Sequence, residues 1–282
     1  MSSSNNPKVM LLMLTYNHFD CVGAAIKSIL SQTYTNFELH IVDDLSEDDT
    51  LKVLKFFENR DFRITVSQNQ VNLGMFENFR INVQRFNDEQ DFEYFAWLGP
   101  DDKWDESWLE KLVLQECTNS PYSIRQTSVE YNFGEKKLIR RYSNILNENL
   151  TYQESKKLRN GYGQLIHGIW HRKTLHSILI DSKILPFEHL FRLENLFVAL
   201  LIEKWGFSTL DEPLHTKQKA IGSYHRYKDN HFFQQPHRIF KIIIRSLPQV
   251  VRIMLKKRRS WKFLLGAWLI DLRISLPIQV KK

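Results

Sequence analysis

The chain of 282 residues contains only two cysteines, Cys21 and Cys117, and neither lies in a spacing typical of metal ligands. Two cysteines do not make a disulfide framework, so the sequence argues against a small disulfide-stabilised secreted fold and predicts a reducing, cytoplasmic compartment. Glycine and proline are also scarce, at 10 and 8 residues, whereas aromatic residues make up 13%. This composition argues against long disordered stretches.

Long apolar runs are missing as well. No uninterrupted apolar stretch approaches the roughly 18 residues that a membrane-spanning helix requires. Residues 1–7 are polar and lack the charged-then-apolar pattern of a signal peptide. With 43% hydrophobic and 25% charged residues, the chain is long enough to bury a substantial core. The sequence therefore predicts a globular protein without a spanning segment.

Acidic residues are almost absent from the carboxyl-terminal end. Residues 236–282, here called the basic tail, carry twelve lysine and arginine residues against one acid, Asp271. Because the whole chain has a net charge of +7, the tail holds +11 and residues 1–235 hold −4. The tail also contains an apolar cluster at residues 261–270, whose tryptophan and basic flanks suit a membrane interface. The alternative is a helical pair that packs on the rest of the protein.

The sequence does contain a regular alternation of strand-like and helix-like segments. Apolar runs of strand length occur at residues 8–15, 37–43, 62–66 and 92–98. Helical spacing of apolar residues occurs at residues 20–32, 48–59, 75–86 and 105–117. Strands separated by helices of about 12 residues predict an α/β fold with a mostly parallel sheet and βαβ crossovers.

Two pairs of adjacent carboxylates, Asp43–Asp44 and Asp101–Asp102, follow two of these strand-like runs. In an open α/β sheet, ligands bind outside the carboxyl ends of the strands. Neighbouring carboxylates repel each other unless a cation or hydrogen-bond donors compensate. Two such pairs predict a polyanionic ligand, such as a nucleotide diphosphate, held through a divalent metal. The alternative for each pair is a helix cap or a turn.

Four segments resemble family 2 glycosyltransferases, which have the GT-A fold. They read Leu-Thr-Tyr-Asn at 14–17, Ile-Lys-Ser-Ile-Leu-Ser-Gln-Thr at 26–33, Phe-Glu-Leu-His-Ile-Val-Asp-Asp at 37–44 and Trp-Leu-Gly-Pro-Asp-Asp at 97–102. The resemblance is dense over residues 8–115. It implies a Rossmann-like GT-A domain with a nucleotide-sugar half at 1–117, an acceptor half at 118–235 and a helical extension at 236–282.

The resemblance also implies a donor site with a metal. Asp102 and Asp101 occupy the family's D-x-D position, here as Pro-Asp-Asp, with one carboxylate on Mn²⁺ or Mg²⁺ and the other on ribose or a metal-bound water. Such a metal neutralises the leaving diphosphate. Asp44 matches the carboxylate that accepts from a uracil imide, which favours UDP. Further donor-site residues are expected to be Thr15, Tyr16, Asn17, Asp43, Asn72, Gly74, Asn78, Lys217 and Lys219, with His225 on phosphate or metal.

The second half of the chain resembles the family more weakly. Its Gly-Ile-Trp-His-Arg segment at 168–172 implies an acceptor region with His167, Trp170 and Arg172, and the alternative is a strand with a core tryptophan. An inverting transferase needs a base for the acceptor hydroxyl. Glu194 is the first candidate for this base and Glu188 the second, although many family members carry Glu-Asp or a lone Asp where this chain has Glu194 and an asparagine.

These observations predict a metal-dependent, inverting transferase. Its partners would be a nucleotide diphosphate sugar, a glycan or lipid-linked glycan acceptor, and the anionic inner face of the plasma membrane. One alternative is a nucleotide-sugar-binding module without turnover. The other is a nucleic-acid-binding protein that uses the basic tail, but the sequence has no recognisable nucleic-acid-binding signature elsewhere, and we predict no nucleic-acid partner.

Overall fold

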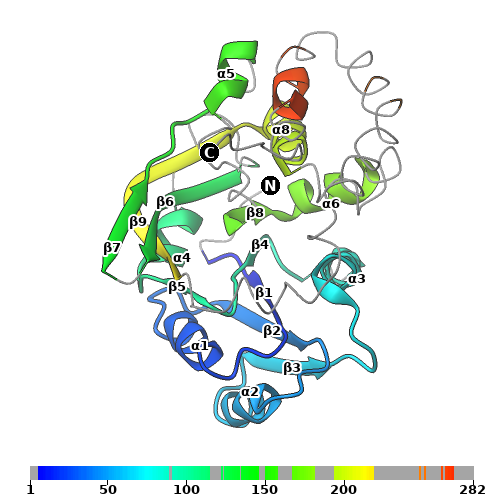
Figure 1. The fold of residues 1–282 in the computed structure, drawn as a ribbon, viewed down its shortest axis with the longest axis vertical. Helices are drawn as coiled ribbons and strands as arrows, with labels where there is room; N and C mark the ends of the chain where they lie inside the picture. Colours follow the sequence, from blue (N-terminus) through cyan, green and yellow to red (C-terminus); the bar gives the residue numbers. More distant parts are fainter. Residues whose placement is uncertain are drawn as a thin grey trace, which may run out of the picture.

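The computed structural model describes most of the first 218 residues and short pieces beyond them. The described residues are 6–88, 91–114, 122, 124–133, 135–145, 150–157, 167–181, 194–218, 248, 251, 262 and 264–269. They form a mixed α/β architecture in which one nine-stranded sheet is flanked by helices (Figure 1). This confirms the predicted fold class.

The sheet has the strand order β3-β2-β1-β4-β8-β6-β9-β5, with β7 paired to β6 off this path. The strands are β1 (Val9–Thr15), β2 (Phe37–Asp43), β3 (Ile64–Gln68), β4 (Tyr94–Trp97), β5 (Asp102–Trp104), β6 (Ile124–Phe133), β7 (Lys136–Arg140), β8 (Ile169–His171) and β9 (Phe207–Gln218). Because β5 pairs with β9, strands from both halves of the chain share one sheet.

The helices cover both faces of the sheet. They are α1 (Val22–Leu30), α2 (Thr50–Glu58), α3 (Gly74–Asp88), α4 (Trp108–Leu114), α5 (Tyr152–Lys157), α6 (Arg172–Asp181) and α8 (Glu194–Trp205). The buried strand β1 alternates between the two cores: Leu12 packs with α3, α6 and α8, and Leu11 with α1, α2 and α4. This alternation follows from the period of two in a strand.

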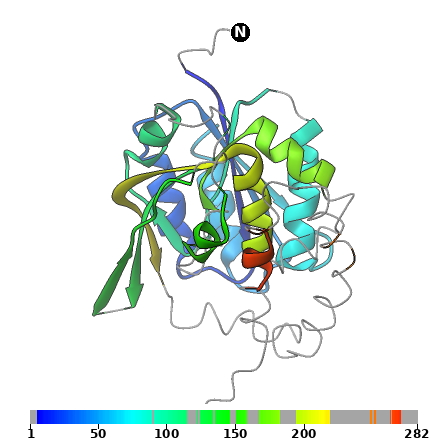
Figure 2. The same cartoon turned by 90° about the horizontal axis from the view of Figure 1, so that it is seen from above.

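The strand directions define one functional edge of the sheet. Strands β1, β2, β3 and β4 are parallel, and β8 is antiparallel to both β4 and β6. Strand β6 therefore points the same way as β4, and β9 is parallel to β6. The carboxyl ends of β1, β2, β4, β6 and β9, together with the amino ends of β5 and β8, lie at this edge, which is here called the carboxyl edge. In Figure 2 it lies opposite the end marked N.

Residues 264–269 of the basic tail pack on the protein. Leu264 and Ala267 are fully buried in the core cluster that contains α8, and Trp268 packs against it. The close approach depends on Gly266, because a Cβ there would lie 1.9 Å from Ser155 Oγ of α5. The expectation that the apolar cluster at 261–270 serves a membrane interface is therefore corrected for residues 264–269. Among the described residues, no helix is long and apolar enough to cross a bilayer.

Candidate active site

The Asp44 carboxylate organises the loop between β3 and α3. Its Oδ1 accepts hydrogen bonds from Asn69 Nδ2 at 2.7 Å and from the Leu73 backbone N–H at 2.9 Å, and its Oδ2 accepts from the Gly74 N–H at 2.7 Å. Asn72 Nδ2 donates to the Asp44 carbonyl oxygen at 3.1 Å. A carboxylate has about four lone-pair directions, so this pattern leaves one direction on Oδ2 for a ligand.

A cleft opens beside this carboxylate at the carboxyl edge of the sheet. It is lined by Leu14, Thr15, Tyr16, Asp44, Asn72, Gly74, Met75 and Asn78. Gly74 adopts a φ of 74° at the start of α3, a conformation that glycine reaches without strain. Asn78 is buried, and its Nδ2 has no hydrogen-bond partner. An orphaned buried donor in a cleft wall is suited to an acceptor atom of a ligand.

The turn after β1 is held by hydrogen bonds to the turn after β2. Asn17 has a φ of 56°, a region that asparagine tolerates. Its N–H donates to Ser46 Oγ at 2.9 Å, and its Oδ1 accepts from the Glu47 N–H at 2.8 Å. Asn17 thereby joins the turn after β1 to the turn after β2. It is outside the residues that line the cleft, whereas the adjacent Thr15 and Tyr16 line it.

Asp43 is fully buried and has a structural environment. Its Oδ1 accepts from Ser46 Oγ at 2.5 Å, and its Oδ2 accepts from the Ser46 N–H at 3.0 Å and from Gln68 Nε2 at 2.9 Å. These donors compensate the charge of the first acidic pair, so no metal is needed there. Of the two neighbouring carboxylates, Asp44 faces the cleft and Asp43 holds the turn.

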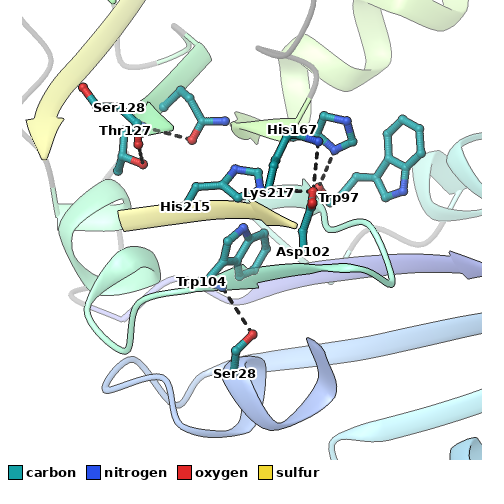
Figure 3. Close-up of polar contacts among 10 residues, drawn as sticks. Ser28, Trp97, Asp102, Trp104, Thr127, Ser128, His167, His215 and Lys217 are labelled. Atoms are coloured by element: carbon teal, nitrogen blue, oxygen red, sulfur yellow. Dashed lines mark hydrogen bonds and ion pairs between the residues drawn. The ribbon is translucent and has the colours of Figure 1, made fainter. Parts of the chain in front are cut away.

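The second acidic pair lies at the same edge, where β5 meets β9. Asp102 is buried, and its Oδ2 accepts hydrogen bonds from Lys217 Nζ at 2.9 Å and from His215 Nε2 at 3.2 Å. His167 lies beside this group, with its Nδ1 3.3 Å from the Trp97 carbonyl oxygen. Figure 3 shows His167, His215 and Lys217 gathered around Asp102. The predicted Lys217 is thus a direct partner of the predicted metal ligand.

The charge balance of this cluster depends on Lys217. Burial by itself would raise the pKa of the Asp102 carboxyl, but the Lys217 ammonium and the hydrogen bond from His215 hold that pKa well below its usual range. Burial lowers the pKa of His215 despite its bond to Asp102, and burial together with Lys217 lowers the pKa of His167 well below its usual value. At neutral pH both histidines are therefore uncharged, and Lys217 is the cation that faces Asp102.

The two carboxylates of the second pair converge above Gly99. A Cβ at residue 99 would lie 3.1 Å from both Asp101 Oδ1 and Asp102 Oδ2. The described residues contain no cluster of three or more histidine, cysteine or acidic side chains able to hold a metal ion. Mg²⁺ is usually bound by one or two carboxylates together with substrate phosphates. Asp101 and Asp102 fit that pattern, with the remaining ligands supplied by the substrate.

The three residues expected at the acceptor separate along β8. His167, before β8, lies at the carboxyl edge beside Trp97. Trp170 is fully buried in the core, which corrects the expectation of an acceptor contact and matches the alternative of a core tryptophan. Arg172 lies at the opposite edge, where its N–H bonds the Glu93 carbonyl oxygen at 2.8 Å. Only a three-residue strand separates the two edges, so a local resemblance could not distinguish them.

Several expected residues lie outside the described residues. These are Glu188, Lys219 and His225, and the side chain of Glu194. The backbone of Glu194 begins α8. Helix α8 is joined to β9 through Gly206, and β9 runs toward the carboxyl edge. The helix start and the strand end lie on the same side of the molecule (Figure 2).

His215 is a site residue that sequence reasoning missed. It is fully buried, and its Nδ1 has no hydrogen-bond partner. The signal available in the sequence was its alternation with Lys217, since residues two apart on a strand face the same side. Strand β9 runs from Phe207 to Gln218, so both residues lie on one strand.

The family of the chain follows from comparison with known proteins. The sequence model described as glycosyl transferase family 2 matches residues 10–180, more than half of the chain. The protein belongs to glycosyl transferase family 2. This confirms the family resemblance found in the sequence.

Curated relatives match a shorter region. An uncharacterized glycosyltransferase of Haemophilus influenzae is 35% identical over 109 residues, which is 39% of this chain and 32% of the relative. The Escherichia coli UDP-Glc:α-D-GlcNAc-diphosphoundecaprenol β-1,3-glucosyltransferase WfgD is 33% identical over 113 residues, which is 40% of this chain and 42% of the relative. The matched region thus spans less than half the length of these relatives.

Solved structures share the fold over most of the chain. S. aureus TarS 1–349 in complex with UDP-GlcNAc has a TM-score of 0.62 at 16% identity, over 86% of this chain and 66% of that one. The mannosyltransferase PcManGT of Pyrobaculum calidifontis, in complex with GDP-Man and Mn²⁺, has a TM-score of 0.51 at 11% identity, over 95% of this chain and 88% of that one. At these identities the likeness establishes a glycosyltransferase fold.

Proposed function

We propose that the protein transfers a sugar from a nucleotide diphosphate sugar, with UDP favoured, to a hydroxyl of a glycan or lipid-linked glycan. The observation that carries this proposal is the position of the Asp44 cleft and of the Asp101–Asp102 carboxylates at one edge of the sheet. The free direction on Asp44 Oδ2 suits a base imide N–H, and the orphaned Asn78 Nδ2 suits a ribose or phosphate oxygen.

The chain's own residues would set up the transfer as follows. Asp101 and Asp102 would hold Mn²⁺ or Mg²⁺, which supplies charge neutralisation of the leaving diphosphate. Lys217 would add a second positive charge beside the leaving diphosphate, since its ammonium lies 2.9 Å from the Asp102 carboxylate. Lys219 and His225 remain predicted contacts of the diphosphate or the metal. Glu194, or Glu188 as the second candidate, would accept the proton of the acceptor hydroxyl for an inverting displacement.

Donor binding tests this proposal directly. A panel of nucleotide sugars with Mn²⁺ should raise the melting temperature of the full chain for one nucleotide class, because a ligand that binds the folded state stabilises it. Asp44→Ala should abolish that rise, since it removes the carboxylate that holds Leu73 and Gly74 at the cleft. Asp91→Ala is the matched control, because that exposed acid lies at the opposite edge.

A product assay separates the transferase from a binding module without turnover. The active transferase should hydrolyse its donor slowly without acceptor and transfer the sugar when one is present, whereas the module would bind without either reaction. A chain whose melting temperature responds to no nucleotide sugar, with or without Mn²⁺, would contradict the donor site itself.

We also propose that the protein associates peripherally with the inner face of the plasma membrane through the charges of the basic tail. The described Lys262 is exposed, whereas Leu264 and Ala267 are buried in the core. The contribution to membrane binding is therefore electrostatic, at about 1 kcal/mol for each basic residue near an anionic leaflet.

A further inference from the structure

A row of side chains runs across the sheet from Asp102 of β5 to β7, the strand that pairs with β6 off the main path of the sheet. Asp102 of β5 is in register with Lys217 of β9, Lys217 with Tyr131 of β6, and Tyr131 with Leu138 of β7. Residues in register on paired strands point to the same face of a sheet. The hydrogen bond from Lys217 to Asp102 agrees with this arrangement. With strands about 4.8 Å apart, the row extends roughly 14 Å from Asp102.

The chemistry of the row changes along its length. It begins with the buried Asp102 and the Lys217 ammonium that pairs with it. It continues with Tyr131, which is partly buried against the core that contains Leu12. The Arg140 guanidinium carbon lies 5.2 Å from the centre of the Tyr131 ring. The row ends at Leu138, which is 48% exposed. An ionic site is thus followed by an aromatic ring with a cation beside it, and then by an exposed aliphatic side chain.

The hairpin of β6 and β7 carries an exposed aliphatic side chain on each face. The end of the hairpin where β6 leads into β7 lies at one side of the molecule, away from the helices (Figure 2). Ile139 is 40% exposed and is in register with Glu130, so it belongs to the other face of the same hairpin. The two aliphatic side chains are alike in exposure, but only Leu138 shares a face with Tyr131 and Lys217.

We propose that this row is the acceptor platform and that the acceptor is an amphipathic, lipid-linked saccharide. The sugar would pack on the Tyr131 ring next to the donor, the anionic phosphate linker would face Arg140, and the first carbons of the lipid would cover Leu138. Along the row, the Tyr131 ring with Arg140 beside it comes before Leu138, and in such a molecule the sugar and the phosphate come before the lipid. This inference rests on the proposed function and assigns its acceptor subsite to named residues.

Binding of a simple probe tests the platform without relying on turnover. The full chain is first saturated with UDP, and then titrated calorimetrically with decyl diphosphate below its micelle-forming concentration, or with methyl diphosphate. We expect decyl diphosphate to bind more tightly than methyl diphosphate. Leu138→Ser should weaken decyl diphosphate binding about tenfold, because it removes apolar contact area, and should leave methyl diphosphate unchanged. Arg140→Ser should weaken both probes.

Ile139→Ser is the control for the hairpin itself. It changes a side chain of similar exposure on the opposite face, so it should leave both affinities unchanged. Equal effects of Leu138→Ser and Ile139→Ser, or equal affinities of the two probes for the unmodified chain, would overturn the proposal. The UDP affinity of each protein is measured in the titration that saturates it, before the probe is added. Loss of UDP binding would count against the donor site, whereas normal UDP binding without chain-length dependence would count against the platform alone.

Discussion

The ion pair between Asp102 and Lys217 gives the first prediction at the residue scale. Asp102→Asn leaves the Lys217 ammonium without its counter-charge, so we expect the free energy of unfolding to fall by about 1–3 kcal/mol. Lys217→Met should also be destabilising, because it leaves a buried carboxylate with His215 as its hydrogen-bond partner. In the double variant, the free energy of unfolding should fall by less than the sum of the two single losses, as expected for contacting residues. Urea unfolding of the four proteins measures this coupling.

The same pair should control metal binding. Lys217 and a divalent metal both need the Asp102 carboxylate, so Lys217→Met should bind Mn²⁺ more tightly in the absence of nucleotide. Asp102→Asn should bind it more weakly. The measurement is the electron paramagnetic resonance signal of free Mn²⁺. A strictly additive stability cycle, together with unchanged Mn²⁺ affinity in both variants, would contradict the role assigned to the pair.

His171 gives a prediction for pH dependence. Burial, with the nearby Lys173, Arg125 and Arg172, lowers the pKa of His171 to about 4, whereas an unfolded histidine titrates near 6.5. The unfolded state therefore binds more protons between these values, and the free energy of unfolding should fall as the pH is lowered from about 6.5 to about 4. The imidazole is partly exposed, so solvent screening reduces the size of the effect.

The comparison that isolates this effect is His171→Asn. An asparagine can still accept from the Lys173 N–H, which bonds His171 Nδ1 at 3.0 Å, but it does not titrate. Chemical unfolding at a series of pH values should show a shallower decline for the variant between pH 6.5 and 4. Parallel curves for the two proteins would mean that other groups, such as the buried His167 and His215, account for the whole slope.

At the scale of elements, Gly266 permits the helical segment at 264–269 to dock on α5. A Cβ at this position would lie 1.9 Å from Ser155 Oγ and 2.7 Å from Ser155 Cβ. We expect Gly266→Ala to cost about 1–3 kcal/mol through overpacking, as measured by thermal and urea unfolding. Adding Ser155→Gly should recover part of the loss, relative to the Ser155→Gly protein. Full tolerance of alanine at 266 would show that the segment does not dock in this way.

Elements also differ in how well the sequence predicts them. The buried strand Phe37–Asp43 was predicted with both of its ends, because its apolar run is long and bounded by polar turns. The short strands β5 and β7 were missed. Strand β5 has three residues and depends on pairing with β9, and β7 is exposed along most of its length. Their strand character comes from long-range pairing, which local periodicity does not report.

In the candidate site as well, the sequence predicted local features better than long-range contacts. The two acidic pairs were predictable as strand-end features. The Asp44 cleft contains six of the residues expected at the donor, which are Thr15, Tyr16, Asp44, Asn72, Gly74 and Asn78. The sequence did not reveal that Asp43 would be compensated by Ser46 and Gln68. It also did not reveal that Arg172 would face the opposite edge, because that outcome depends on the register of β8 against β4.

At the scale of the whole molecule, the charge split predicts salt-sensitive membrane binding. The full chain should bind vesicles that contain anionic lipid, and the variant with Lys256, Lys257, Arg258 and Arg259 changed to glutamate should not. Because Leu264 and Ala267 are buried in the core, salt should remove nearly all of the binding. Co-sedimentation across a salt series is the measurement. Vesicle binding that persists at high salt would indicate an apolar anchor instead.

The pairing of β5 with β9 also sets the order in which the two parts of the site can form during synthesis. Asp102 is joined to His215 and Lys217 across 113 and 115 positions of sequence, whereas the Asp44 cleft is built from residues 14–78. During synthesis, local contacts form early and long-range strand pairing forms late. A nascent chain can therefore complete the nucleotide cleft long before the carboxylate cluster. The proposed chemistry becomes available only when β9 has emerged from the ribosome and paired with β5.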